Sequence, residues 1–112
     1  MSLFDEQQAF LKQVPVLINK AFELGFQVTA GEMLRTPEQQ QLYVNSGRSK
    51  TMHSNHLIKC AIDLNLFVAG VFANKVQLQD LGNFWESLDP KNRWGGNFST
   101  IVDTPHFERN LA

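Results

Sequence analysis

The sequence centres on one stretch, Ser54-Asn55-His56-Leu57-Ile58-Lys59-Cys60-Ala61-Ile62-Asp63. Over residues 60–67, large apolar side chains alternate with small or polar ones, and this pattern predicts a β-strand. Its apolar face would carry Ile62, Leu64 and Leu66. Asp63 falls on the other face, flanked by large apolar neighbours. A carboxylate in the middle of such a strand is poorly hydrated, so it requires a cation, a metal ion or a shifted pKa.

Two histidines can join Asp63 in a metal site. His56 lies seven residues before Asp63, and His106 follows far downstream, at the end of Asp103-Thr104-Pro105-His106. These residues can supply three protein ligands to zinc, and three ligands leave the fourth tetrahedral position open for water, as in catalytic zinc sites. Asp103 adds a carboxylate that can handle the protons of that water. The spacing alone also fits histidines that only make hydrogen bonds. The poorly hydrated Asp63 favours the interpretation as a small zinc hydrolase.

Composition restricts the class of protein. A chain of 112 residues with 43% hydrophobic content is expected to form one domain, which can bury roughly two thirds of its unfolded surface. The net charge of −1 provides no positive surface for nucleic acid or an anionic membrane, and no apolar run is long enough to span a bilayer. The single cysteine, Cys60, excludes an intrachain disulfide. The first residues lack the segments of a secretory signal, so we expect synthesis in the cytoplasm and action on other compartments only after release.

Helical and strand patterns follow one another without βαβ order. Ser2 and Asp5 form a capping box for a first helix that Gly25 would end, and Pro15 either kinks this helix or divides it. Thr36 and Pro37 are typical of a helix start. The expected elements are a helix up to residue 24, a strand over 26–30, a helix over 37–46, the strand over 60–67, a helix over 78–88 and closing strands over 94–98 and 101–107. This order predicts an α+β fold with a small, mainly antiparallel sheet and packed helices.

The motifs together resemble a known family. Ser54-x-His56, Ala61-x-Asp63 and Asp103-x-x-His106 resemble the zinc peptidoglycan peptidases that include the VanX/VanY D-alanyl-D-alanine peptidases. Within that family the sequence is most similar to the phage endolysins that act as L-alanyl-D-glutamate peptidases or D,D-carboxypeptidases. The resemblance extends to residues 34–40, 46–50 and 93–96, and it covers residues 26–108 in the family's order. Lys59 departs from the pattern, because many relatives carry glycine there, and a positive φ would make lysine costly.

The resemblance implies a fold, a cofactor and a substrate. The fold would be that of the D-Ala-D-Ala peptidases and hedgehog-like domains, with a single peptidase domain over residues 1–112. One zinc ion per chain would be held by His56, Asp63 and His106, with Asp103 rather than Glu108 as general acid/base. The substrate would be the peptidoglycan stem peptide, cut by a phage or prophage endolysin. We expect a monomer with no nucleic-acid or membrane partner.

Three further residues are candidates for substrate binding. For Arg35 the resemblance favours a clamp on a substrate carboxylate, since guanidinium binds carboxylate bidentately. Ser54 lies two residues before His56, on the same face if the segment is extended, and either donates to substrate or to a zinc ligand, or is a turn residue. Trp94 either lines the substrate groove or belongs to the core. His53 falls on the opposite face from His56 and is assigned to the surface.

Two other functions fit the same residues. One is a zinc-binding module without catalysis, as in relatives of this fold that serve as signalling domains. Asp103 argues against it, because a site without catalysis has no need of that carboxylate. The other is a cytoplasmic dipeptidase that hydrolyses free D-Ala-D-Ala. A small closed pocket would favour the dipeptidase, and an open groove would favour the endolysin.

Overall fold

The computed structural model describes residues 1–49, 51–52 and 54–111. Helices and short strands follow one another as an α+β fold, in agreement with the expectation from the sequence. The elements in chain order are α1 (Leu3–Glu23), β1 (Gln27–Ala30), α2 (Pro37–Asn45), the 3₁₀ helix η1 (Asn55–Ile58), β2 (Ala61–Val68), β3 (Val71–Phe72), α3 (Lys75–Leu88), β4 (Asn92–Trp94), the 3₁₀ helix η2 (Gly95–Asn97) and β5 (His106–Arg109). None of the helices in the described ranges is long and apolar enough to cross a membrane.

The sheet is antiparallel, with strand order β1-β2-β5-β4 and with β3 paired to the end of β2. In the register of β2 and β5, Asp63 lies opposite His106, and Ile62 lies opposite Phe107. Successive side chains of a strand point to opposite faces. The register therefore places Asp63 and His106 together on one face and directs Ile62 and Phe107 to the other.

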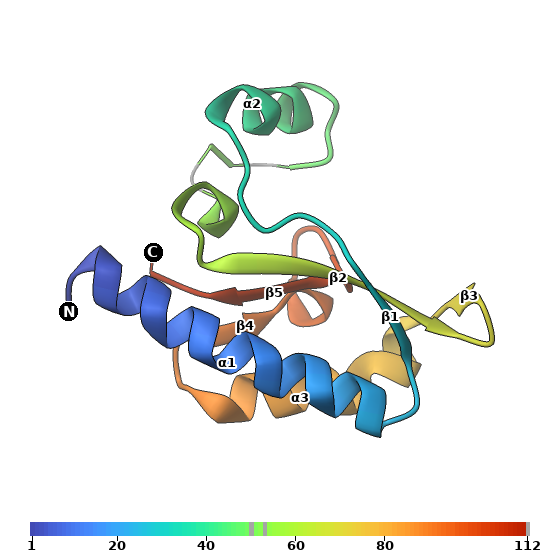
Figure 1. Ribbon diagram of the computed structural model, residues 1–112. Coiled ribbons are helices and arrows are strands. Elements are labelled where there is room, and N and C mark those ends of the chain that lie inside the picture. The colour runs from blue at the N-terminus through green and yellow to red at the C-terminus, as the bar shows by residue number, and fades with distance from the viewer. Residues whose placement is uncertain (50, 53, 112) are drawn as a thin grey trace.

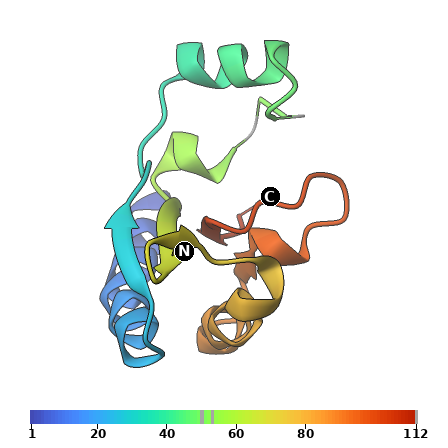
Figure 2. The same ribbon diagram turned by 90° about the vertical axis from the view of Figure 1, so that its right-hand side faces the viewer.

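The face that carries Ile62 and Phe107 packs on the core. Helices α1 and α3 lie along this side of the sheet, whereas α2 and η1 lie on the other side (Figures 1 and 2). Phe10 of α1 meets Trp85 of α3 edge to face, with ring centroids 5.8 Å apart, and Trp85 meets Phe107 in the same way at 6.3 Å. The predicted apolar face of β2 is confirmed, because Ile62, Leu64 and Leu66 are all buried in this cluster.

Local sequence signals account for the ends of several helices. Ser2 and Asp5 form the predicted capping box, and α1 continues without a break past Pro15. Thr36 accepts the backbone N–H of Gln39 at the start of α2. A capping box of Asn74 and Gln77 begins α3. These caps satisfy backbone donors that have no partner inside their own helix.

The closing segments differ from the prediction. The strand expected over residues 94–98 ends at Trp94, and residues 95–97 form η2 instead. The strand expected over 101–107 begins only at His106. The reason is a close contact at Gly95, whose carbonyl accepts the N–H of Asp103 at 2.9 Å. A Cβ at Gly95 would lie 2.0 Å from the Asp103 carbonyl oxygen, so only glycine allows the loop to fold back here.

Candidate metal centre and active site

Three potential ligand atoms converge on the face of the sheet opposite the core. Asp63 and His106 come from paired strands, and His56 comes from η1. The three atoms His56 Nε2, Asp63 Oδ1 and His106 Nδ1 form a triangle. Nε2 lies 3.2 Å from Oδ1 and 3.1 Å from Nδ1, and Nδ1 lies 3.3 Å from Oδ1. The side chains predicted as metal ligands are therefore adjacent in the structure.

Local structure directs the His56 ring into this triangle. Ser54 caps η1 by accepting the backbone N–H of His56 at 3.2 Å, and Lys59 ends η1 in the left-handed region with φ 61°. Lys59, where many relatives carry glycine, thus occupies a backbone conformation in which glycine is less strained. His56 belongs to a 3₁₀ helix rather than to an extended segment, so the prediction that Ser54 and His56 share one face of an extended segment was wrong. His53 itself lies outside the described residues.

Hydrogen bonds outside the triangle decide which nitrogen of each ring is free. His56 Nδ1 lies 2.9 Å from the carbonyl oxygen of Met33, which can only accept, so Nδ1 donates and Nε2 keeps its lone pair. His106 Nε2 lies 2.6 Å from Glu108 Oε1, and donation to this carboxylate leaves Nδ1 with the lone pair. When both rings are neutral, two imidazole lone pairs and the Asp63 carboxylate face one another, and such a set of acceptors requires a cation, either a proton on His106 or a metal ion.

The triangle has the size that a tetrahedral metal ion requires. Nitrogen and oxygen ligands bind zinc at about 2.0–2.2 Å, so adjacent ligands of a tetrahedral site lie about 3.3–3.6 Å apart. The observed separations of 3.1–3.3 Å approach this spacing. His56 and His106 are buried, and each has an outer hydrogen-bond partner of the kind that orients metal-binding histidines. The residues fit a divalent metal ion, and two imidazoles with one carboxylate are a set that zinc accepts.

The electrostatics of the triangle favour positive charge. Burial lowers the pKa of His106, but hydrogen bonds with Asp63 and Glu108 outweigh this effect and raise that pKa to about 9. Burial raises the pKa of Asp63, but the contacts with His106 and His56 outweigh it and hold that pKa well below its usual range. The site therefore stabilises a proton or a metal ion in the same place.

Both carboxylate oxygens of Glu108 are engaged. Oε1 contacts His106, and Oε2 accepts from Arg93 Nη2 at 2.8 Å and from Asn55 Nδ2 at 2.9 Å. Burial raises the pKa of Glu108, but His106 and Arg93 hold it below its usual value. The sequence left Glu108 as a competitor of Asp103 for the acid/base role. These contacts hold Glu108 against the His106 ring and favour an orienting role for it over the acid/base role.

Asp103 lines the same cavity as the three candidate ligands. Its main chain is held by the bond from its N–H to Gly95 and by the bond that its carbonyl accepts from the His106 N–H at 3.1 Å. Asp103 is exposed to solvent in this cavity, but partial desolvation by the residues around it still raises its pKa, and the charges of His106 and His56 only partly oppose this. A carboxylate with a raised pKa is better suited to take and return a proton.

Arg35 lies beside the triangle, but most of its donors already have partners. Nε donates to Glu32 Oε1 at 2.7 Å, and Nη1 donates to Gln40 Oε1 at 2.9 Å and to Ser54 Oγ at 3.5 Å. Nη2 lies 3.8 Å from Asp63 Oδ2. A carboxylate binds a guanidinium through two neighbouring nitrogens, and each such pair in Arg35 includes a nitrogen that already has a partner. This limits the use of Arg35 as a carboxylate clamp.

The packing of Trp94 favours the core alternative for its side chain. Its side chain is fully buried, and a Cβ at Gly82 or Gly96 would lie about 2 Å from the indole ring. Trp94 Nε1 donates to the Thr104 carbonyl at 2.9 Å. The indole therefore packs in the core and anchors the loop carrying Asp103, while Trp94 also borders the cavity that holds the candidate ligands.

The cavity around the triangle has a volume of about 910 Å³ and receives residues from α2, η1, β2, β5 and the loop after β4. Sequence reasoning missed the contacts that Glu32, Gln40 and Tyr43 make with Arg35. Glu32 and Tyr43 lay outside the motifs, and the motif at residues 34–40 contained Gln40 without giving it a role. The carbonyl of Met33 gave no sequence signal at all. Glu108 did give one, since it lies two residues after His106 on the same strand face.

Comparison with known proteins agrees with this site. A family model described as D-alanyl-D-alanine carboxypeptidase matches residues 47–109, more than half of the chain. The L-alanyl-D-glutamate peptidase of Listeria phage A118 is 35% identical over 88 residues, which are 77% of this chain and 31% of that protein. The chain thus spans about a third of the length of this relative.

A solved structure resembles the chain over nearly its whole length. The crystal structure of the L-Ala D-Glu endopeptidase ChiX of Serratia marcescens has a TM-score of 0.70 and 23% sequence identity, and the match covers 96% of this chain and 85% of that one. This likeness shows the fold. Because the family model spans the segment that carries all three candidate ligands and the phage relative supports it, the chain belongs to the D-alanyl-D-alanine carboxypeptidase family of peptidases.

Proposed function

We propose that the chain is a zinc-dependent peptidase that hydrolyses an amide bond of the peptidoglycan stem peptide. It would act as a phage or prophage endolysin of the L-alanyl-D-glutamate endopeptidase or D,D-carboxypeptidase type, as a monomer that reaches the cell wall after release. The observation that carries the proposal is the convergence of His56 Nε2, Asp63 Oδ1 and His106 Nδ1 in a cavity that also receives Asp103. Family membership and the name of the phage relative support the substrate class.

The chain's own groups would divide the work as follows. His56, Asp63 and His106 would hold zinc, which when bound polarises a carbonyl and lowers the pKa of water to about 7. Asp103 would take a proton from the attacking water as the new C–O bond forms. It would return that proton to the leaving amine as the C–N bond breaks. Glu108 would keep the His106 ring oriented throughout.

Arg35 and Ser54 would orient the substrate through the donors they still have free. The Nη2 group of Arg35 is its least engaged nitrogen and can donate to one substrate oxygen. The Ser54 hydroxyl accepts from His56 and Arg35, and its own O–H remains available as a donor. Arg35 would contribute mainly positive charge beside Asp63.

The size of the cavity favours a peptide over a free dipeptide. Pockets for small organic ligands range over roughly 300–1,000 Å³, and this cavity of about 910 Å³ lies near the upper end. A dipeptide such as D-Ala-D-Ala would fill only part of it. The presence of Asp103 in the same cavity favours a catalytic site over a zinc-binding module without turnover.

The test is mass spectrometry of fragments released from purified sacculi by the zinc-loaded protein. Cleavage at L-alanyl-D-glutamate should release peptides with a new D-glutamate amino terminus, and D,D-carboxypeptidase activity should release D-alanine. Chelator-treated protein and Asp103→Asn serve as controls and should release far less. If the sacculi stay intact, hydrolysis of free D-Ala-D-Ala would indicate the dipeptidase, and no turnover of either substrate would indicate the module without catalysis.

A further inference from the structure

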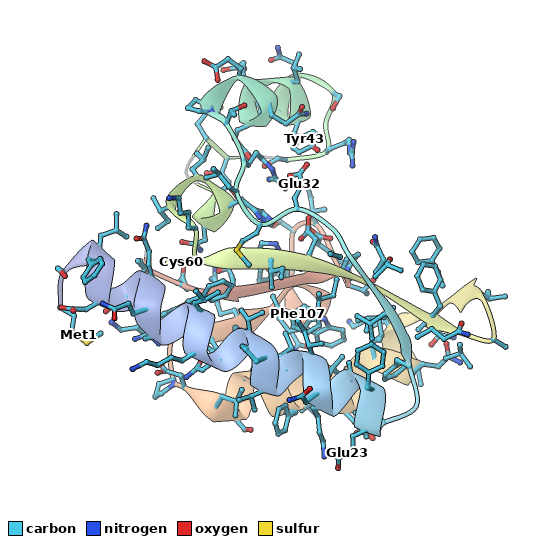
Figure 3. All side chains as sticks on the ribbon, viewed as in Figure 1. Met1, Glu23, Glu32, Tyr43, Cys60 and Phe107 are labelled. Atoms are coloured by element: carbon cyan, nitrogen blue, oxygen red, sulfur yellow. The ribbon has the colours of Figure 1, made fainter. Side chains whose placement is uncertain are left out.

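Two guanidinium groups stack on the ring of Tyr43, which projects from α2 toward Glu32 (Figure 3). The Cζ atom of Arg35 lies 4.6 Å from the ring centroid, and that of Arg48 lies 4.5 Å from it. The Tyr43 hydroxyl donates to Glu32 Oε2 at 2.5 Å, which fixes the ring. Stacking on an aromatic face holds a guanidinium in place and leaves its N–H donors at the edge available.

The main chain of Arg48 is fixed as well. Its N–H and that of Ser49 donate to the Tyr43 carbonyl at 2.8 and 3.1 Å, after a turn at Gly47 with φ +80°. The fully buried Gln40 donates from Nε2 to Ser49 Oγ at 2.9 Å and to the carbonyl of the following described residue, Thr51, at 2.6 Å. Arg48 is therefore presented from an anchored segment.

Arg48 differs from the other arginines of the cavity in its partners. Arg35 faces Glu32 and Asp63, and Arg93 pairs with Glu108. Among the residues that the structure describes, Arg48 has an aromatic contact but no carboxylate and no hydrogen-bond acceptor for its guanidinium. It is exposed on the wall of the cavity that holds the candidate metal ligands. Its charge and its donor fork are available to a ligand.

We infer that Arg48, held against Tyr43, forms a carboxylate subsite that makes the cavity select peptides with a free carboxylate beside the scissile bond. This inference rests on the proposed function and names a specificity residue for it. Glutamate has two carboxyl groups, so when one continues the peptide chain the other stays free. An L-alanyl-D-glutamate unit therefore brings a carboxylate next to the bond that is cut. Arg48 can bind it bidentately, whereas the fork of Arg35 is already engaged.

Calorimetric titration of the zinc-loaded chain tests the inference without turnover. The probes are L-alanyl-D-glutamyl-L-lysine peptides in which a ketomethylene group replaces the scissile amide. One has a free glutamate carboxylate and an amidated carboxyl terminus, the second has both groups amidated, and the third has only the terminus free. We expect wild type to bind the first about 3- to 10-fold more tightly than the second, the range of an exposed charge-assisted contact.

Variants of Arg48 test whether this residue causes the ratio between the two affinities. Arg48→Gln should reduce it to about one, and Arg48→Lys should keep part of it because a point charge remains without the fork. Lys12→Gln is the matched control, since Lys12 is an exposed cation on α1, across the sheet from the cavity, and should leave the ratio unchanged. Arg48 is exposed, so unchanged melting temperatures should show that the variants remain folded.

The inference is overturned if wild type does not distinguish either carboxylate form from the double amide, or if Arg48→Gln keeps the full ratio. A ratio that appears only with the free terminus would also overturn the inference, because Arg48 would then bind a carboxylate that is remote from the scissile bond. Digestion of sacculi by the same proteins is measured separately. Intact sacculi beside a retained binding ratio would reject the proposed function and leave the subsite standing.

Discussion

Two groups of ionisable side chains, each partly buried, lie on the two faces of β5 and are built in opposite ways. On the core face, Arg109 Nε lies 2.6 Å from Glu6 Oε2 and Nη1 lies 2.8 Å from Asp89 Oδ2, while Lys91 Nζ lies 2.7 Å from Glu6 Oε1. We call these four residues the ion-pair cluster. On the other face, the acceptors of His56, Asp63 and His106 converge and form the candidate metal centre.

The difference between the two groups is a balance of charge. In the ion-pair cluster each carboxylate meets a cation supplied by the chain, so the buried charges are compensated internally. In the metal centre the outward ring nitrogens are occupied by Met33 and Glu108, and the inward atoms are all acceptors. A buried set of acceptors is stable only with a cation from outside the chain. The first group holds α1 on the sheet, and the second is prepared for a ligand.

The largest effect should come from removing a ligand of the metal centre. We expect His56→Ala or His106→Ala to reduce hydrolysis of a muropeptide to the uncatalysed level, because the remaining two ligands no longer hold the ion. Chelation of wild type should do the same, and added zinc should restore activity. Turnover of a defined muropeptide measures this effect. Normal turnover by one of these variants would exclude the histidine that it replaces from the site.

Asp103→Asn should separate catalysis from metal binding. The amide keeps the shape of the side chain but cannot take a proton, so kcat should fall by roughly 10²- to 10⁴-fold. Zinc content should stay at the wild-type level, because we propose Asp103 as the acid/base and not as a ligand. Steady-state kinetics with parallel metal analysis give both numbers. Near-normal turnover of this variant, with Glu108→Gln inactive, would transfer the acid/base role to Glu108.

Glu108→Gln should have a smaller effect on the same centre. The amide oxygen can still accept from His106, but the negative charge is lost. Replacing such outer partners typically costs roughly 10- to 100-fold in metal affinity or activity. Competition with a chelator of known affinity measures the change. Zinc affinity equal to wild type would mean that the contact with Glu108 does not tune the metal centre.

Glu6→Gln should affect stability alone and so sharpen the contrast between the two groups. Hydrogen bonds from Lys91 and Arg109 hold the pKa of Glu6 below its ordinary value of 4.5. Because the folded-state pKa is lowered, this stabilisation is present above about pH 4.5 and is lost as the pH falls through the folded-state value. The variant should melt at a lower temperature at pH 7 and lose less stability between pH 7 and pH 3. Thermal unfolding followed by circular dichroism tests this, and loss of zinc would contradict it.

Features set by local patterns were predictable from the sequence. The alternation in β2 placed Asp63 on the face away from the core, and the capping residues located the start of α1 and α2. Alternation and capping act within a few residues, so they can be detected without the fold. The candidate ligands followed from residue type and from the resemblance of their motifs to a family, because spacing alone left other interpretations open.

Features set by contacts between distant segments were not predictable. The loop before β5 is irregular because Asp103 folds back on Gly95, and no periodicity encodes this contact. Trp94 was ambiguous because burial of an indole depends on what packs against it. The partners of Arg35 come from separate segments, and only the structure shows that they occupy most of its donors.

The most direct test of the account is the zinc content of the purified chain after apo-protein has been reloaded and dialysed. Inductively coupled plasma mass spectrometry on wild type, His53→Ala, Glu6→Gln, His56→Ala and His106→Ala decides it. We expect about one zinc per chain in the first three proteins, as for a single three-ligand site, and no retained zinc in the last two. The opposite result, with zinc lost in His53→Ala and retained in His56→Ala, would contradict the assignment of the metal centre.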